Sequence, residues 1–172
     1  AAIATFKRVR TIMKVMVEQI DILETLTPMS FNSFRDRLET ASGFQSVQFR
    51  EFEFLLGYKR AEILRFHPAD SPAYALLEQR LREPSIIDAL YRFLEANGAV
   101  IPSELRERVT ILFELMTDFD EGFQEWRYRH IKLVERSIGS KRGTGGSLGV
   151  EFLKQSLFQP VFPDLWSIRH EL

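Results

Sequence analysis

A histidine in the second half of the chain is the first residue whose position suggests chemistry. His130 follows Phe123 by seven residues and Trp126 by four, so on a helix the three side chains would share one face. A histidine on such a face is commonly a core residue whose ring nitrogens are both hydrogen-bonded. The alternative is an axial ligand to a haem iron, because the chain has no cysteine and neither His67 nor His170 stands at metal-ligand spacing to it. Both interpretations stay open, and we expect His67 and His170 at the surface.

The segment FNSFRDRL combines aromatic and basic side chains at helical spacing. Phe31 and Arg35 are four residues apart and would share a helix face, with Leu38 about one turn further along. An arginine beside apolar side chains can bind a carboxylate through two parallel hydrogen bonds, while the apolar groups hold an apolar body. The same pattern describes an arginine that lies along the edge of a core with its charge in water. Taken alone, the segment favours this second interpretation.

The glycine-rich stretch RGTGGSLG, residues 142–149, invites comparison with phosphate-binding loops. A P-loop has its lysine after the glycines and a strand before them, whereas here Lys141 precedes the glycines and no strand is predicted. A dinucleotide-binding loop also follows a strand. The glycines nevertheless allow close approach of a ligand to the backbone, and Thr144 is the only hydroxyl between two of them. The pattern therefore argues against phosphate and leaves the partner of this loop open.

The elements that must position these residues are all predicted to be helices. Apolar residues recur at three and four positions, and no segment alternates in the manner of a strand. Residues 60–71 read as a connector. The predicted helices cover residues 3–26, 30–38, 45–56, 72–82, 86–97, 103–138 and 150–157, with N-caps at Ser30, Ser71, Ser85 and Ser103. The fold class is therefore all-α, and the long helix 103–138 carries His130.

Composition limits the classes of function. A length of 172 residues suggests one domain, and a net charge of −1 gives no field that would attract nucleic acid or an anionic membrane. No apolar run approaches the roughly 18 residues of a membrane span. The absence of cysteine excludes disulfides and thiolate sites and fits a reducing cytoplasm. Fifteen phenylalanines and two tryptophans can fill a helical core or line a pocket for a flat apolar ligand.

Two blocks of the sequence resemble tryptophan 2,3-dioxygenases of the bacterial type. They are TPMSFNSFRDRLETASGFQSVQFREFEFLLGYK and WRYRHIKLVERSIGSKRGTGGSLGVEFL, which contain the motifs FxxFR, SGFQSxQFR and GTGGSxG in this order. The resemblance implies a helical bundle of the tryptophan/indoleamine dioxygenase type. It also implies a haem b enzyme that uses O2 to cleave the indole C2–C3 bond of L-tryptophan and gives N-formylkynurenine, the first step of the kynurenine pathway. Members of this family are cytoplasmic homotetramers.

The resemblance also assigns roles to residues on the substrate side. Arg35 is expected to pair with the carboxylate of L-tryptophan, and Phe31 and Leu38 to flank its indole. Thr144, in the glycine-rich loop, is expected to hydrogen-bond the amino-acid head of the substrate.

On the cofactor side, the resemblance makes His130 the axial ligand of the haem iron. This histidine stands fourteen residues before the threonine of the GTGGSxG motif, as the family pattern requires. Ser42 and Gly43, from the SGFQSxQFR motif, are expected near both haem and substrate.

The sequence departs from the family pattern in two places. Family members carry an N-terminal segment with a distal histidine, whereas this chain has no histidine before Phe31, so we expect no catalytic residue in the printed chain. Family members also carry extra helical residues near positions 105–106. We expect residues 1–172 to form one haem-dioxygenase domain without these parts. Two alternatives are a haem dioxygenase acting on another indole and a non-catalytic helical assembly module without haem.

Overall fold

Helices account for every regular element among the residues that the computed structural model describes, which are 1–39, 43–98, 101–139, 141 and 150–171. The all-α prediction is therefore confirmed. The chain divides into two compact units, Ala1–Ala41 with Glu107–Leu172, and Ser42–Arg106. No helix in these described ranges has a stretch long and apolar enough to cross a membrane.

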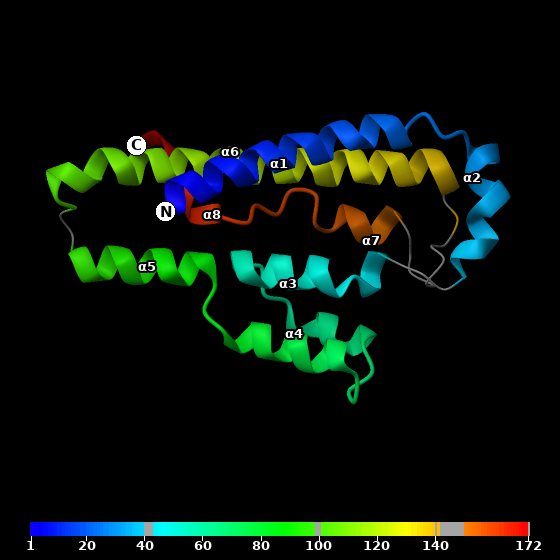
Figure 1. Ribbon diagram of the computed structural model, residues 1–172, viewed down its shortest axis with the longest axis horizontal. Helices are drawn as coiled ribbons and strands as arrows, with labels where there is room; N and C mark the ends of the chain where they lie inside the picture. The colour runs from blue at the N-terminus through cyan, green and yellow to red at the C-terminus, as the bar shows by residue number, and fades with distance from the viewer. Residues whose placement is uncertain (40–42, 99–100, 140, 142–149, 172) are drawn as a thin grey trace. The chain divides into compact units, whose positions relative to one another are not determined.

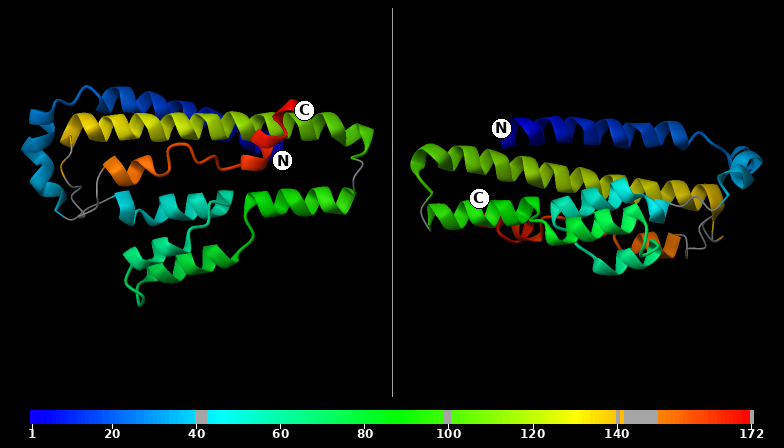
Figure 2. Two further views of the ribbon diagram at one scale, coloured as in Figure 1. Left: turned by 180° about the vertical axis from the view of Figure 1, so that it is seen from behind. Right: turned by 60° about the horizontal axis from the view of Figure 1, so that its bottom comes forward.

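Two long helices form the frame of the first unit. Helix α1 (Ala2–Leu23) and helix α6 (Ser103–Ile138) lie side by side and run in the same direction (Figures 1 and 2). Phe6 meets Phe119 edge-on, with ring centroids 6.4 Å apart. Gly122 lets α1 approach closely, because a Cβ at this position would lie 3.2 Å from Cγ of Met13. The contacts of Phe6 and Met13 with α6 are thus apolar and close.

Ion pairs accompany this seam along its length. Arg10 pairs with Asp118 at 2.5 Å, and Arg129 pairs with Asp21 and, at 3.0 Å, with Glu24. Exposed pairs of this kind contribute little to stability, typically about 0–1 kcal/mol each. Their positions increase together along α1 and α6, so they fix the parallel register of the two helices.

Helix α6 continues without a break from Ser103 to Ile138, as predicted. On the face predicted for Phe123, Trp126 and His130, only Phe123 is buried. Phe113, Asp120 and Arg127 are buried, whereas His130 is only half-buried. That expectation concerned these three residues only and did not include the two charged side chains of the buried face, Asp120 and Arg127.

The C-terminal part of the chain returns along α6. It contains helix α7 (Val150–Lys154), helix α8 (Pro163–Ser167) and a 3-10 turn over Arg169–Glu171 (Figure 2). The ring of Phe162 is fully buried and lies 6.3 Å from that of Phe119. This segment therefore covers a second face of α6.

The turn between α1 and the next helix differs from prediction. Helix α1 ends at Leu23, earlier than residue 26, and helix α2 covers Pro28–Arg35. A cap at Ser30 was wrong: Thr27 is the N-cap, and its Oγ1 accepts a hydrogen bond from the Ser30 N–H at 3.1 Å. The reason is that proline favours the first helical position, which makes the residue before it the cap.

The second unit begins with a 3-10 turn and then contains three α-helices and another 3-10 helix. Phe54, Ile63 and Leu77 form its buried core. The predicted connector 60–71 contains the second 3-10 helix. In chain order the elements are η2 (Gly43–Gln45), α3 (Val47–Leu56), η3 (Ala61–Phe66), α4 (Pro72–Arg82) and α5 (Ile86–Asn97).

Several helix ends of the second unit agree with the sequence. Ser71 caps α4 through the N–H of Tyr74, at 3.1 Å. Ser85 and Asp88 form a reciprocal capping box at the start of α5. Gly57 ends α3 with φ +120°, a conformation that L side chains rarely adopt. Local sequence signals at serine, proline and glycine therefore fix these boundaries.

Candidate functional site

His130 lies at the end of a row of nearly parallel aromatic rings on α6. Its imidazole stacks on the indole of Trp126, with centroids 5.2 Å apart and an interplanar angle of 4°. Trp126 in turn stacks on Phe123 at 6.2 Å and 11°, and Phe123 on Phe119 at 6.0 Å and 14°. We call these four residues the aromatic ladder. Contacts on the imidazole face and along a rigid helix restrict the orientation of the His130 ring.

The ring nitrogens of His130 have no hydrogen-bond partner among the residues that the structure describes. Burial lowers the pKa of this imidazole below its ordinary value, so the ring is neutral near pH 7. A neutral imidazole has a lone pair on one nitrogen that can bind a metal. Among the described residues His130 is thus not a core histidine with both nitrogens bonded, and its role as a ligand stays a prediction.

A metal site made only of protein ligands is not seen in the described ranges. No three His, Cys, Asp or Glu side chains there lie close enough together to hold a metal ion. Haem iron is a different case, because the porphyrin supplies the equatorial ligands and one axial histidine can suffice. A haem site would therefore need only His130 as its protein ligand, and this role stays a prediction.

The predicted substrate segment forms α2 and the 3-10 turn that follows it, Asp36–Leu38. Phe31 and Arg35 are half-buried, and Leu38 is 37% exposed. Phe31 meets Phe34 edge-on, at 5.3 Å and 78°. Helix α2 lies beside the C-terminal end of α6 in every view (Figures 1 and 2), eight residues beyond His130. The structure thus brings the two predicted elements to the same end of the first unit, without a direct ring contact between Phe31 and His130.

The structure does not place three other predicted site residues relative to His130. Ser42 and Thr144, with the glycine-rich loop 143–149, lie outside the described residues. Gly43 is exposed and begins the first turn of the second unit. The roles that the sequence suggests for these three residues stay predictions.

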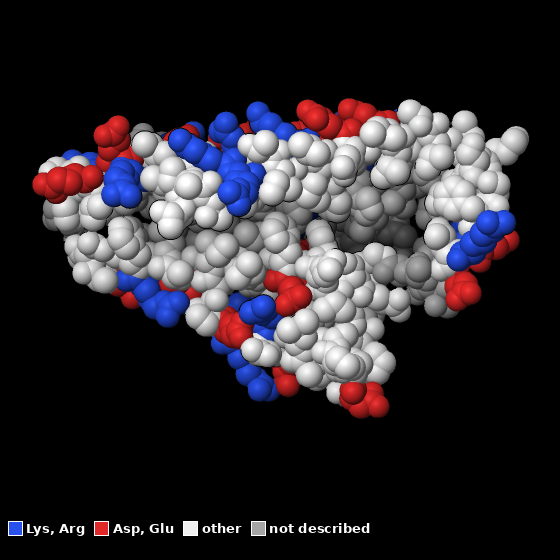
Figure 3. Space-filling model, in the orientation of Figure 1, with Lys and Arg blue, Asp and Glu red and all other residues white. Residues whose placement is uncertain are grey.

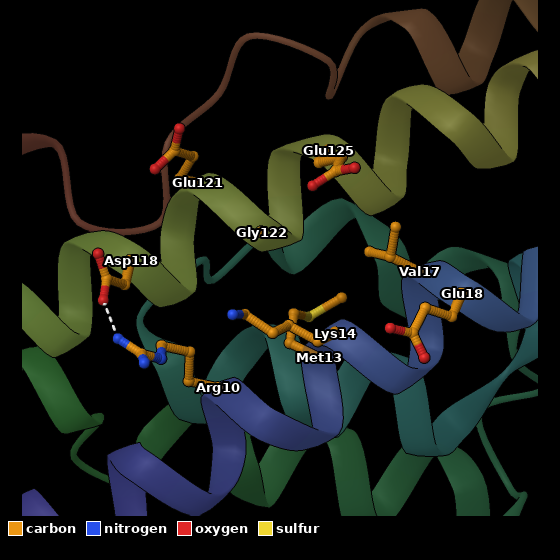
Figure 4. A pocket seen from close by; sticks show the side chains of 9 residues that line it. All are labelled: Arg10, Met13, Lys14, Val17, Glu18, Asp118, Glu121, Gly122 and Glu125. Carbon is orange, nitrogen blue, oxygen red and sulfur yellow. Dashed lines mark hydrogen bonds and ion pairs between the residues drawn. The ribbon is translucent and has the colours of Figure 1, made fainter.

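A cleft of about 560 Å³ lies between α1 and α6 (Figure 4), and none of the predicted site residues lines it. A site for an indole would need a largely apolar lining with a few polar groups, and this cleft has four carboxylates and two basic side chains. It therefore does not match the predicted substrate. It is lined by Arg10, Met13, Lys14, Val17, Glu18, Asp118, Glu121, Gly122 and Glu125.

Asp120 is a buried carboxylate that the sequence analysis missed. It is fully buried, and it accepts hydrogen bonds from the backbone N–H groups of Val161 and Phe162 and from Nε1 of Trp166, at 2.9–3.0 Å. A carboxylate with several N–H donors is a strong anchor, because charge-assisted hydrogen bonds are the stronger kind. It fixes the C-terminal segment on α6 at the start of the aromatic ladder.

Arg127 lies seven residues after Asp120 on α6 and holds the same C-terminal segment at a second point. Its Nη1 donates to the carbonyl oxygen of Gln159 at 2.8 Å, and its guanidinium lies 4.2 Å from the centroid of the Phe123 ring. Asp120 and Arg127 both fall on the seven-residue repeat that begins at buried Phe113. The sequence does contain a signal for this role, because the repeat places both charged residues at positions where core residues are expected.

The predicted location of His67 was wrong. It was expected at the surface but is buried in the second unit, and its Nε2 has no hydrogen-bond partner there. His67 directly follows the 3-10 helix η3, whose Ile63 belongs to the core, so the turn carries it inward. His170 is exposed, as predicted.

Comparison with known proteins gives the family. Nearly the whole chain matches the sequence profile described as tryptophan 2,3-dioxygenase, in two stretches, residues 1–95 and 95–172. The chain is 48% identical to a tryptophan 2,3-dioxygenase of Herpetosiphon aurantiacus over 193 residues, which covers 98% of this chain and 74% of the relative. It is 46% identical to one of Anaeromyxobacter dehalogenans, over 99% of this chain and 74% of the relative. The chain therefore belongs to the tryptophan 2,3-dioxygenase family.

The comparison also locates a difference from these relatives. The aligned stretch of 193 residues exceeds the 172 residues of the chain by 21, so the relatives hold additional residues inside the matched region. The two stretches of the family match meet at residue 95, near the end of α5, and the predicted shortening near 105–106 stays a prediction. Helix α6 runs through 105–106 without a break.

Proposed function

We propose that this protein is a haem-dependent dioxygenase that cleaves the indole C2–C3 bond of L-tryptophan with O2. The product is N-formylkynurenine, and the reaction opens tryptophan catabolism by the kynurenine pathway. Relatives named tryptophan 2,3-dioxygenase, at 48% and 46% identity over nearly the whole chain, support the reaction. The observation that carries the cofactor assignment is the stacked imidazole of His130, which is neutral near pH 7 and has no hydrogen-bond partner in the described part.

His130 would hold the iron of haem b as its axial ligand. Haem supplies the redox-active iron for the reaction between O2 and the indole, which protein side chains cannot provide. The aromatic ladder holds the imidazole in one orientation and keeps water from one face of the ring. Burial also keeps this histidine unprotonated, which is the form that binds metals.

Helix α2 would bind the substrate. L-Tryptophan carries a carboxylate, an ammonium group and a flat apolar body. Arg35 would bind the carboxylate through two parallel hydrogen bonds, and Phe31 and Leu38 would flank the indole. The half-buried positions of Phe31 and Arg35 on one short helix support this assignment, because partial burial strengthens the ion pair and leaves room for a ligand.

The assignments of the other residues rest on the family motifs. Ser42 and Gly43 would lie near haem and substrate, and Thr144 would hydrogen-bond the amino-acid head of tryptophan. We also propose that residues 1–172 act as one haem-dioxygenase domain, because both stretches of the chain match one family. A cytoplasmic homotetramer is the state that the family resemblance supports.

Reconstitution with haemin tests the cofactor assignment. The protein should bind haem with a Soret band, and His130→Ala should abolish this band while the helical circular dichroism stays. A protein without a Soret band would favour a helical assembly module without haem. A loaded protein that forms product from a substituted indole but none from L-tryptophan would favour a haem dioxygenase acting on another indole.

Substitution of Arg35 tests the assignment of the substrate-binding residues. Arg35→Ala should weaken tryptophan binding by about 2–5 kcal/mol, because it removes one partner of a charge-assisted pair. Arg37→Ala is the matched control, since Arg37 is an exposed arginine of the following turn. Equal affinity for tryptophan in the two variants, measured by titration of the loaded protein, would contradict the role of Arg35.

A further inference from the structure

Helix α2 has one half-buried face, to which the proposed function gives only part of a role. Phe31, Phe34 and Arg35 are half-buried, whereas the other residues of α2 are exposed. Their spacing of three and four positions places these side chains on one face of the helix. Phe34 is the second aromatic residue of the motif FxxFR, and the proposed function uses only the first aromatic residue and the arginine. The role of Phe34 is therefore open.

The polarity of α2 changes along its length. Arg35 is the only charged residue of the helix and lies in its last turn. In Figure 3 the surface over α2 is white, and charged side chains follow at its C-terminal end. L-Tryptophan likewise has an apolar body and a charged head. On this face Phe31 and Phe34 thus belong to the part that would meet the indole.

The two aromatic rings of this face are in contact with each other. Their centroids lie 5.3 Å apart and their planes meet at 78°, which is a favourable edge-to-face arrangement. Such a contact uses at most one face of each ring, so the other face of Phe31 can lie against a flat ligand. The arrangement also requires one orientation of both rings. Phe34 therefore restricts the rotation of Phe31 about its side-chain bonds.

The backbone of α2 already holds Phe31 at the start of the helix. The Phe31 N–H donates to the carbonyl oxygen of Thr27 at 2.9 Å, and the Thr27 side chain caps the first turn. A helix of two turns has little stability of its own, so the contact between Phe31 and Phe34 also stabilises α2. Loss of Phe34 can thus act in two ways. It can release the ring of Phe31, or it can loosen the whole helix together with Arg35.

We propose that Phe34 is a positioning residue of the indole site, which holds the Phe31 ring in the orientation that flanks the indole. By fixing this ring it also limits the substituents that the indole can carry. A side chain that is already ordered loses less freedom when the ligand binds, so the fixed ring strengthens binding. This inference rests on the proposed binding of tryptophan by α2, and it adds to that proposal the residue that shapes the site for the indole.

A double-mutant cycle tests whether Phe34 acts through Phe31. In the haem-loaded protein, Phe34→Ala should raise the dissociation constant of L-tryptophan about two- to tenfold, measured by spectral titration. In the Phe31→Ala background the same substitution should change it less than about twofold. Phe34→Tyr, which keeps the ring, should restore the affinity. Met29→Ala is the matched control, because it shortens an exposed apolar side chain of the same helix. An equal loss in both backgrounds would show that Phe34 acts without Phe31 and would overturn the proposal.

A second ligand separates the positioning role from a loosened helix. For a tryptophan with a methyl group on its benzene ring, Phe34→Ala should raise the dissociation constant less than for L-tryptophan, because a released Phe31 ring can turn away from the methyl group. Arg35→Ala should weaken both ligands by the same factor, since both carry the same carboxylate. Equal factors for Phe34→Ala would indicate a loosened helix and overturn this inference alone. If Arg35→Ala binds L-tryptophan as well as the parent protein does, the proposed role of α2 fails, and this inference fails with it.

Discussion

Replacing Asp120 should destabilise the protein more than any single exposed carboxylate does. Asp120 is fully buried and accepts hydrogen bonds from Val161 N, Phe162 N and Trp166 Nε1, at 2.9–3.0 Å. Asp120→Ala leaves these three donors without an acceptor. An unsatisfied buried donor costs about 1–3 kcal/mol, so the expected loss in the free energy of unfolding is about 3–6 kcal/mol after partial relaxation toward water.

The neighbouring carboxylate on α6 provides the control. Asp118 pairs with Arg10 at 2.5 Å, but both side chains are more than 40% exposed. Asp118→Ala should therefore cost less than about 1 kcal/mol. Asp120→Asn should fall between the two variants, because the amide keeps one oxygen acceptor but turns an NH₂ group toward the remaining donors.

Urea unfolding measures these differences, with circular dichroism reporting the helices and tryptophan fluorescence reporting the C-terminal segment. Trp166 donates to Asp120, so its fluorescence reports directly on this contact. A loss below 1 kcal/mol for Asp120→Ala, or equal losses for Asp118→Ala and Asp120→Ala, would refute the reasoning. A variant in which Trp166 is exposed before the helices unfold would show that the segment detaches separately.

Other residues give shorter tests. In the haem-free protein, burial holds the pKa of His130 below that of the unfolded chain, about 6.5. The unfolded state therefore binds the proton first, stability falls as pH falls below about 6.5, and His130→Gln should flatten this fall in urea unfolding at a series of pH values. Trp126→Ala should speed haem loss from the reconstituted protein about three- to tenfold, and Trp126→Phe should restore slow loss, because stacking contributes about 0.5–1.5 kcal/mol. Gly57→Ala should cost about 1–3 kcal/mol in thermal unfolding, since φ is +120° and the new Cβ would lie 2.8 Å from Ile87. Gly98→Ala, with no atom within 4 Å, should cost less.

Helix positions and their ends follow from the sequence because they depend on local chemistry. Ser71 and Ser85 cap their helices, as predicted, and Gly57 and Gly98 follow the predicted last residues of theirs, 56 and 97. The cap at Thr27 was missed because a hydroxyl inside the first turn, Ser30, offered a competing signal. In each of these cases the information lies within a few residues.

The buried charges of α6 could not be found in the same way. Asp120 is stable in the core only because backbone donors more than 40 residues later turn toward it. Arg127 depends in the same way on the carbonyl of Gln159. Periodicity marks both positions as buried, but it cannot supply partners from a distant segment. A rule based on apolar residues alone therefore does not assign these two charged side chains to the core.

The candidate site shows the same division. Motifs selected His130, Phe31 and Arg35 from single short segments, and helices α6 and α2 carry them to one end of the first unit. The stacking of Trp126 on His130 is also local, since four residues on a helix bring two rings together. The spacing on α6 contains this contact, although the sequence analysis used it only to assign a common face.

A continuous series of aromatic contacts along α6 connects the C-terminal segment to His130. Phe119 contacts Phe162 of the C-terminal segment and stacks on Phe123, and the ladder continues to Trp126 and His130. The hydrogen bonds of Asp120 hold Phe162 in place, about 15 Å along the helix from His130 at 1.5 Å per residue. If the segment braces the ladder, Asp120→Ala should loosen the imidazole and speed haem loss at urea concentrations where the helices stay folded. If α6 alone holds the ladder, haem loss should be unchanged until the helix unfolds. The structure favours the first result, because Phe162 is fully buried against Phe119.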